Sequence, residues 1–154
     1  MALMFFPDRG AAIREMGRVS TPGGTVAVLV PGSLDAQAAY GPFVERAARS
    51  AGSEARSLLS TYFACGDLEL LVRLFEQAGL DVAATSTEHG TARFPSVEAL
   101  VATEVDSTPL GERLRPDVYE QLVTGAREVL APFTGDDGSL AAPFECTLVA
   151  ARRP

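Results

Sequence analysis

The chain has 154 residues and a net charge of −7, and its 13 basic residues other than the single histidine are all arginine. An acidic chain without a basic cluster excludes nucleic acid and anionic membranes as expected partners, because affinity for both depends on neutralising negative charge. No apolar stretch approaches the roughly 20 residues of a membrane span, and no basic segment precedes the first apolar run as in a secretory signal. We therefore expect a cytoplasmic protein, with residues 1–154 forming a single domain.

The first 30 residues predict a helix followed by a strand. Ala2–Phe6 is a short apolar run that we interpret as the stub of a strand. Asp8 is a suitable N-cap for a helix that continues to Val19, and Pro22-Gly23-Gly24 ends that helix. The β-branched run Thr25–Val30 predicts a strand buried on both faces. Together these segments are typical of half of a parallel βαβ unit.

The middle of the chain predicts two helices and a second strand. Apolar spacing indicates a helix from about Asp35 to Ser50. Asp67 is expected to cap another helix, which Gly79 ends in a left-handed conformation. The β-branched and small residues of Asp81–Arg93 favour a strand.

The last third of the chain predicts two more helices and a closing strand. Ser96 starts a short helix, and Asp117, followed by Glu120, has the pattern of a capping box for a helix that ends at Leu130. Phe144–Arg152 alternates between two faces and predicts a strand. The whole pattern predicts an α/β fold.

No catalytic constellation stands out among the polar residues. His89 is the only histidine, and no cysteine lies near it in the sequence to suggest a metal site. Cys65 and Cys146 form no Cys-x-x-Cys motif, which is typical of two thiols in a cytosolic protein. Tyr62 and Phe63 either line an apolar pocket or belong to the core, and periodicity does not decide between these positions.

Three consecutive stretches resemble the second half of class I S-adenosylmethionine (SAM)-dependent methyltransferases. They are FFPDR at residues 5–9, AIREMGRV at residues 12–19 and PGGTVAV at residues 22–28. They are most similar to the small-molecule (UbiE/type-11-like) group, in which such a segment follows the fourth strand and leads into the fifth. LFEQAGL at residues 74–80 resembles the helix end before the sixth strand, and residues 146–153 resemble the antiparallel seventh strand.

The resemblance implies a partial Rossmann-like methyltransferase fold. The family sheet has the strand order 3-2-1-4-5-7-6, and this chain is expected to supply the fifth, sixth and seventh strands. The family's Gly-rich SAM-binding loop and the acidic residue that binds the ribose have no counterpart in the sequence. We therefore expect a truncated, substrate-side half that neither binds SAM normally nor catalyses alone.

The resemblance also implies candidate site residues. Met4 and Phe5, at the remnant of the fourth strand, are the marginal candidates for contact with SAM. The candidates for contact with a small-molecule substrate are Phe6, Arg9, Tyr40, Tyr62 and Phe63.

Two functional hypotheses stay open. In the first, a separately encoded or fused N-terminal half completes a methyltransferase. In the second, the chain is a non-enzymatic dimeric module that binds a small apolar ligand or a protein. Because Thr25–Val30 would be an exposed edge without the N-terminal half, we expect a homodimer through this strand or through swapped elements.

Overall fold

A computed structural model describes residues 2–154, which divide into two compact units. Unit 1 contains the described residues up to Ser33, together with Tyr62–His89 and Glu145–Pro154. Unit 2 contains Leu34–Thr61 and Gly90–Phe144. That the chain forms a single domain stays a prediction, and the two units are described separately below.

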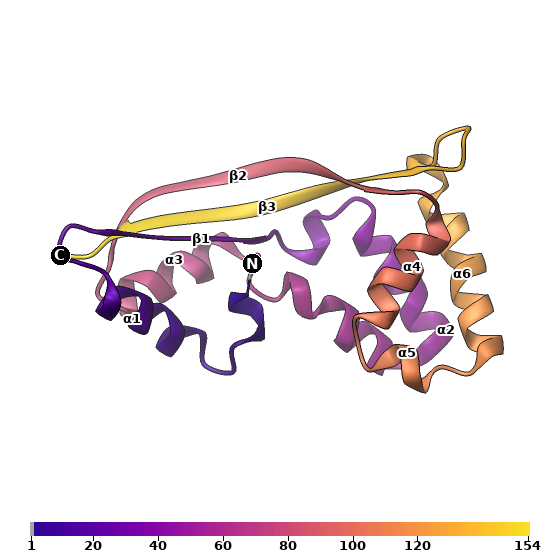
Figure 1. The fold of residues 1–154 in the computed structure, drawn as a ribbon, viewed down its shortest axis with the longest axis horizontal. Coiled ribbons are helices and arrows are strands. Elements are labelled where there is room, and N and C mark those ends of the chain that lie inside the picture. The colour runs from indigo at the N-terminus through magenta and orange to yellow at the C-terminus, as the bar shows by residue number, and fades with distance from the viewer. Residues whose placement is uncertain (1) are drawn as a thin grey trace. The chain divides into compact units, whose positions relative to one another are not determined.

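A three-stranded sheet, with strand order β1-β3-β2, forms the framework of unit 1. β1 (Thr25–Pro31) pairs in antiparallel fashion with the end of β3 (Leu140–Arg152), in a register that runs from Thr25↔Arg152 to Pro31↔Cys146. β2 (Asp81–Phe94) lies on the other side of β3 and also runs opposite to it (Figure 1). The chain therefore has a mixed α/β fold with an antiparallel sheet.

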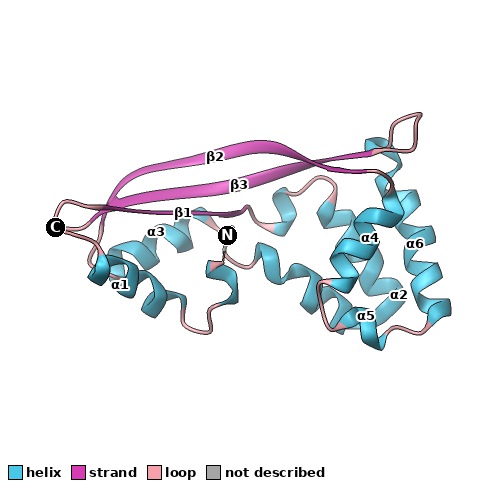
Figure 2. Cartoon of the chain, in the orientation of Figure 1, coloured by secondary structure: helices cyan, strands magenta, loops and turns pink. Residues whose placement is uncertain are grey.

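Two helices of unit 1, α1 (Arg9–Val19) and α3 (Leu68–Gln77), lie against the same side of the strands (Figure 2). Ile13 of α1 and Phe75 of α3 are fully buried in one apolar cluster with the inward side chains of β1, which are Val26, Val28 and Val30. The intervening residues Thr25, Ala27 and Leu29 are exposed. The expected burial of this strand on both faces is therefore wrong, because the helices of unit 1 cover one face only.

The first apolar run forms a 3-10 helix, η1 (Leu3–Phe5), and the predicted strand stub at Ala2–Phe6 is wrong. A strand needs a neighbour for its backbone groups, whereas a 3-10 turn satisfies them locally. The Phe5 amide donates to the Ala2 carbonyl at 3.0 Å, and the Phe6 amide donates to the Leu3 carbonyl at 3.2 Å. This turn buries Leu3 and Met4 and leaves Phe5 and Phe6 exposed.

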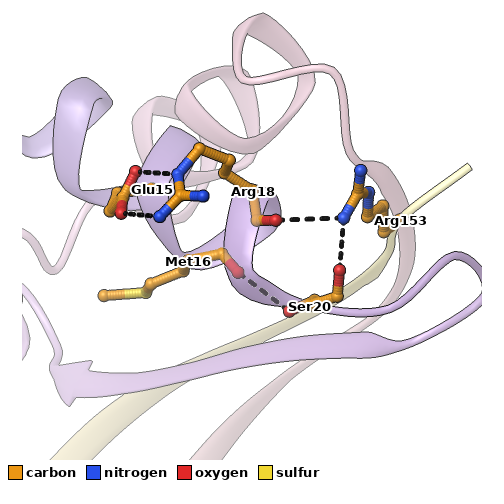
Figure 3. A network of polar contacts seen from close by, with 5 residues as sticks. All are labelled: Glu15, Met16, Arg18, Ser20 and Arg153. Atoms are coloured by element: carbon orange, nitrogen blue, oxygen red, sulfur yellow. Dashed lines mark hydrogen bonds and ion pairs between the residues drawn. The ribbon is translucent and has the colours of Figure 1, made fainter.

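The C-terminal segment of the chain binds the end of α1 (Figure 3). The Arg153 guanidinium donates to the Arg18 carbonyl at 3.0 Å and also to the Ser20 carbonyl. A cation at the carboxyl end of a helix is favourable because the last carbonyls carry partial negative charge. On the exposed side, Arg18 Nε and Nη2 each donate to a Glu15 carboxylate oxygen at 2.7 Å.

Helices form most of unit 2. α2 (Tyr40–Ser60) packs on α6 (Pro116–Leu130), which also packs on α4 (Val97–Asp106), and α5 (Leu110–Arg113) contacts α4. Gly52 interrupts α2 with a φ of 83°. No helix in the described part of the chain combines the length and the apolar composition that a membrane span requires.

The structure confirms the helix caps predicted at Asp8 and Asp67, each of which accepts a hydrogen bond from an amide three residues later. Ser96, predicted to start a helix, likewise accepts a hydrogen bond from the Ala99 amide. Two helix starts differ from the prediction. α6 begins at Pro116 with no side-chain cap, so the capping box at Asp117 is wrong. The helix expected from Asp35 begins at Tyr40, because Pro42 lacks an amide hydrogen and is tolerated only in a first turn.

The close backbone approach of Gly66 to Gly32 gives a stability test. A Cβ atom at residue 66 would overlap the Gly32 carbonyl and the Ser33 nitrogen, and neither backbone group can move aside without displacing β1. We expect Gly66→Ala to lower the free energy of unfolding by about 2–3 kcal/mol in urea denaturation. Gly90→Ala is the control, since its nearest contact would be the Phe144 carbonyl oxygen at 3.9 Å. Equal stability of the two variants would contradict the packing described.

Candidate functional site

The carboxyl end of β1 is the place in unit 1 where sequence-distant segments meet. The loop before α3 crosses this end, with Gly66 in close backbone contact with Gly32 and Ser33. Thr147 of β3 donates its hydroxyl to the Gly66 carbonyl at 3.3 Å, and the Gly32 amide donates to the Glu145 carbonyl at 2.8 Å. We take this end of β1 as the candidate site because Tyr62, a predicted substrate residue, lies four positions before Gly66 in the segment that meets it.

An aromatic pair joins η1 to the segment that precedes Gly66. The Phe5 and Tyr62 rings meet edge to face, with centroids 5.3 Å apart and an interplanar angle of 85°. Phe5 is 54% exposed, and Tyr62 is half-buried. The structure thus brings together two residues that were predicted separately as cofactor and substrate contacts.

Arg9, a predicted substrate residue, is the first residue of α1. Its Nε atom is buried and has no hydrogen-bond partner among the described residues. Burial raises the pKa of the Cys65 thiol, and the positive charge of Arg9 opposes that rise, so the guanidinium lies near this cysteine. Cys65 itself is buried in the apolar cluster of unit 1.

The other predicted residues of unit 1 differ in accessibility. Met4 and Phe63 are buried, and Met4 belongs to the apolar cluster that includes Val28. Phe6 is 45% exposed beside Phe5. The roles predicted for Met4, Phe6 and Phe63 stay predictions, with only Phe6 presenting its side chain to solvent.

Tyr40 lies in unit 2, where its side chain is buried among aromatic and acidic residues. It is 5% exposed, and its ring meets that of Phe144 edge to face at 5.5 Å. Its hydroxyl forms a hydrogen bond with the half-buried carboxyl of Glu104. Burial raises the pKa of both groups, and the charge of Glu104 raises that of Tyr40 further. The substrate role of Tyr40 stays a prediction.

Three residues of these two regions were not predicted as site residues: Cys65, Glu104 and Phe144. A signal for Glu104 was present in the sequence, since it follows Leu100 by four positions and Val101 by three on a helix whose apolar stripe is buried. A lone carboxylate on such a stripe is unusual and indicates a buried partner. Cys65 and Phe144 carry no comparable signal.

The groups at the β1 end are suited to binding more than to acid–base chemistry. They include the Phe5–Tyr62 aromatic pair, whereas His89 lies in β2 with an exposed ring, its Nδ1 3.9 Å from Glu145 Oε2. Within residues 2–154, no three His, Cys, Asp or Glu side chains gather closely enough to hold a metal ion.

Comparison with known proteins defines the class of fold. Among solved structures, the chain is similar to a putative methyltransferase from Bacillus halodurans C-125, with a TM-score of 0.54 and 16% sequence identity. The match covers 100% of this chain and 67% of that chain. The chain therefore has a methyltransferase-like fold. No protein-family model and no curated protein matches the sequence.

The buried Tyr40–Glu104 pair gives a pH test in unit 2. Because burial raises the pKa of Glu104 in the folded chain above its ordinary value of 4.5, the folded state keeps this proton after the unfolded state has lost it. The contribution of Glu104 to the stability of the fold is therefore fully present below pH 4.5. It is lost as the pH rises through the pKa of Glu104 in the folded chain.

Glu104→Gln removes this dependence and keeps an acceptor for the Tyr40 hydroxyl. Urea denaturation between pH 4 and pH 7 should show the native chain losing stability relative to the variant as the pH rises. Glu120→Gln, at an exposed position of α6, is the control and should follow the native chain. Parallel pH curves for the native chain and Glu104→Gln would contradict the buried pair.

Proposed function

We propose that this chain is the substrate-side half of a class I SAM-dependent methyltransferase of the small-molecule type. The observation that carries the proposal is the strand order β1-β3-β2, with β3 antiparallel to β1, in a fold whose likeness to a methyltransferase structure spans the whole chain. The family resemblance assigns these strands as the fifth, seventh and sixth, and that is the order in which the family sheet places them.

SAM is the cofactor of the complete family fold, and the residues present here do not by themselves fit it. Met4 is 3% exposed within the apolar cluster, which leaves Phe5 as the accessible side chain of the two marginal candidates. The sequence holds no Gly-rich loop after a strand to supply the amides that such cofactors use. We infer that another segment, in the same polypeptide or a separate one, supplies the SAM-binding elements.

In such an enzyme this half would hold the methyl acceptor. The Phe5–Tyr62 pair gives a surface for a flat apolar body. Holding the acceptor in line with the methyl group to be transferred accelerates the reaction through proximity and orientation. Little acid–base chemistry is required of the residues at this end of β1.

Calorimetric titration of the purified chain with SAM tests whether this chain leaves SAM binding to another segment. We expect no heat of binding up to near-millimolar SAM for the 154-residue chain, because the Gly-rich loop is not part of it. Heat at micromolar SAM would contradict the proposal. The coding DNA upstream gives an independent check, since a Gly-rich methyltransferase motif in or near the same reading frame would support the substrate-side assignment.

A second candidate function, a non-enzymatic dimeric module, is favoured by the position of β1. Within the described residues β1 is an edge strand, and the alternating register points the amides of Thr25, Ala27 and Leu29 away from β3. The side chain of Leu29 is 39% exposed on the open face of the sheet. An exposed edge with apolar side chains invites pairing with another chain.

Light scattering with size-exclusion chromatography tests this second candidate. We expect the native chain to be a homodimer at micromolar concentration and Leu29→Lys to shift it to a monomer, because a charge on an edge strand blocks pairing. Leu70→Lys, at a similarly exposed leucine of α3, is the control and should stay dimeric. A native chain that is a well-behaved monomer would refute the homodimer.

A further inference from the structure

We propose that β1 pairs with β1 of a second copy of this chain, in antiparallel fashion and centred on Val28, so that the two sheets join edge to edge. The proposal rests on the second candidate function, the dimeric module, and it names the surface, the symmetry and the register of that dimer. The pairing is measurable on the chain alone, without SAM.

The outer edge of β1 carries hydrogen-bonding groups that other described residues do not use. The Gly32 amide donates to the Glu145 carbonyl at 2.8 Å, so the even-numbered positions of this segment face β3. The odd-numbered positions face outward, and their amides have no acceptor among the described residues. These amides belong to Thr25, Ala27 and Leu29, and the remaining odd-numbered residue, Pro31, has no amide hydrogen.

This edge lacks the features that usually keep edge strands apart. Natural edge strands are often very short, bulged or charged. β1 has 7 residues in unbroken pairing with β3, and its sequence TVAVLVP contains no charged residue. Although the chain has a net charge of −7, two copies can therefore meet along β1 without placing like charges directly opposite each other.

Two-fold symmetry determines the direction of the pairing. In most homodimers the same surface of each copy meets across a two-fold axis. An axis perpendicular to the sheet makes the two β1 strands antiparallel and keeps α1 and α3 of both copies on one side of the joined sheet (Figure 2). Antiparallel strands form hydrogen bonds between residues that lie directly opposite each other. The outward odd-numbered residues of one copy must therefore lie opposite odd-numbered residues of the other.

The register centred on Val28 satisfies this condition with complete overlap of the two strands. Thr25 then lies opposite Pro31 of the second copy, and Ala27 lies opposite Leu29. Every outward amide faces a carbonyl in this arrangement. Pro31, which cannot donate, lies where only its carbonyl is used, so its missing amide hydrogen costs no hydrogen bond.

The side chains favour the same register. On the open face it places Ala27 opposite Leu29, a small side chain against a large exposed one. A register centred on Ala27 would instead place Ala27 opposite itself and leave Pro31 beyond the end of the other strand. On the helix-covered face, Val28 lies opposite its own copy, and Val26 lies opposite Val30. These valines are buried in the apolar cluster of unit 1, so the pairing brings the clusters of the two copies together.

Isotope-filtered NOE spectroscopy on dimers mixed from ¹³C-labelled and unlabelled native chains tests the register. The Cα atoms of a non-hydrogen-bonded antiparallel pair are about 4.5 Å apart, which brings their Hα atoms into NOE range. We expect intermolecular Hα–Hα contacts from Val28 to Val28 and from Val26 to Val30. Contacts from Val26 to Val28, as the register centred on Ala27 requires, would overturn the proposal, as would a monomeric chain or the absence of intermolecular contacts along β1.

Charge-pair variants give a second test of the register. Ala27→Lys and Leu29→Asp should each weaken the dimer when present alone, because each places a charge opposite an apolar side chain. When they are combined, each introduced lysine lies opposite an introduced aspartate of the other copy, and the dimer should recover about fivefold in affinity relative to Leu29→Asp. Thr25→Lys combined with Leu29→Asp is the matched control and should not recover. Recovery in the control alone would overturn the proposal.

The NOE measurement uses the native chain, so the proposal stays testable if a variant does not fold. A dimer that forms through another surface or in another register overturns this proposal and leaves the dimeric module in place, whereas a monomer overturns both. Titration with SAM tests the methyltransferase assignment independently of either result.

Discussion

The antiparallel pairing of β3 with β1 is the constraint on which the rest of unit 1 depends. β3 comes last in the sequence and lies in the middle of the sheet, so β1 and β2 are joined only through it. The register places Val28 opposite Val149 and sends their side chains into the core under α1 and α3. The same pairing uses one edge of β1 and leaves its other edge facing away from β3.

The position of the candidate site follows from that pairing. β3 fixes the carboxyl end of β1, and Gly32 at that end approaches Gly66 so closely that only glycine fits at residue 66. This backbone contact holds the loop that carries Tyr62, whose ring meets Phe5. The Phe5–Tyr62 pair is thus positioned in part by main-chain packing, which allows a binding surface to be set before a ligand arrives.

Features set by local interactions could be predicted from the sequence, whereas those set by tertiary packing could not. The caps at Asp8 and Asp67 need only an amide three residues away, so the sequence contains all of their determinants. The family motif likewise indicated a methyltransferase-like fold. The one-sided burial of β1 and the 3-10 turn at Leu3–Phe5 depend on which neighbours are present, and an apolar run does not reveal them. The burial of Glu104 depends on Tyr40, which lies far away in the sequence.

We propose that another segment completes this part of a methyltransferase-like fold through the free edge of β1. Amide hydrogen exchange along β1, measured by NMR on the chain diluted until it is monomeric, tests whether that edge is free. We expect alternation, with slow exchange at Val26, Val28 and Val30, whose amides face β3, and fast exchange at Ala27 and Leu29. Exchange at Ala27 and Leu29 as slow as at Val28 in the monomer would show that the edge is already covered, and no further segment could pair with it.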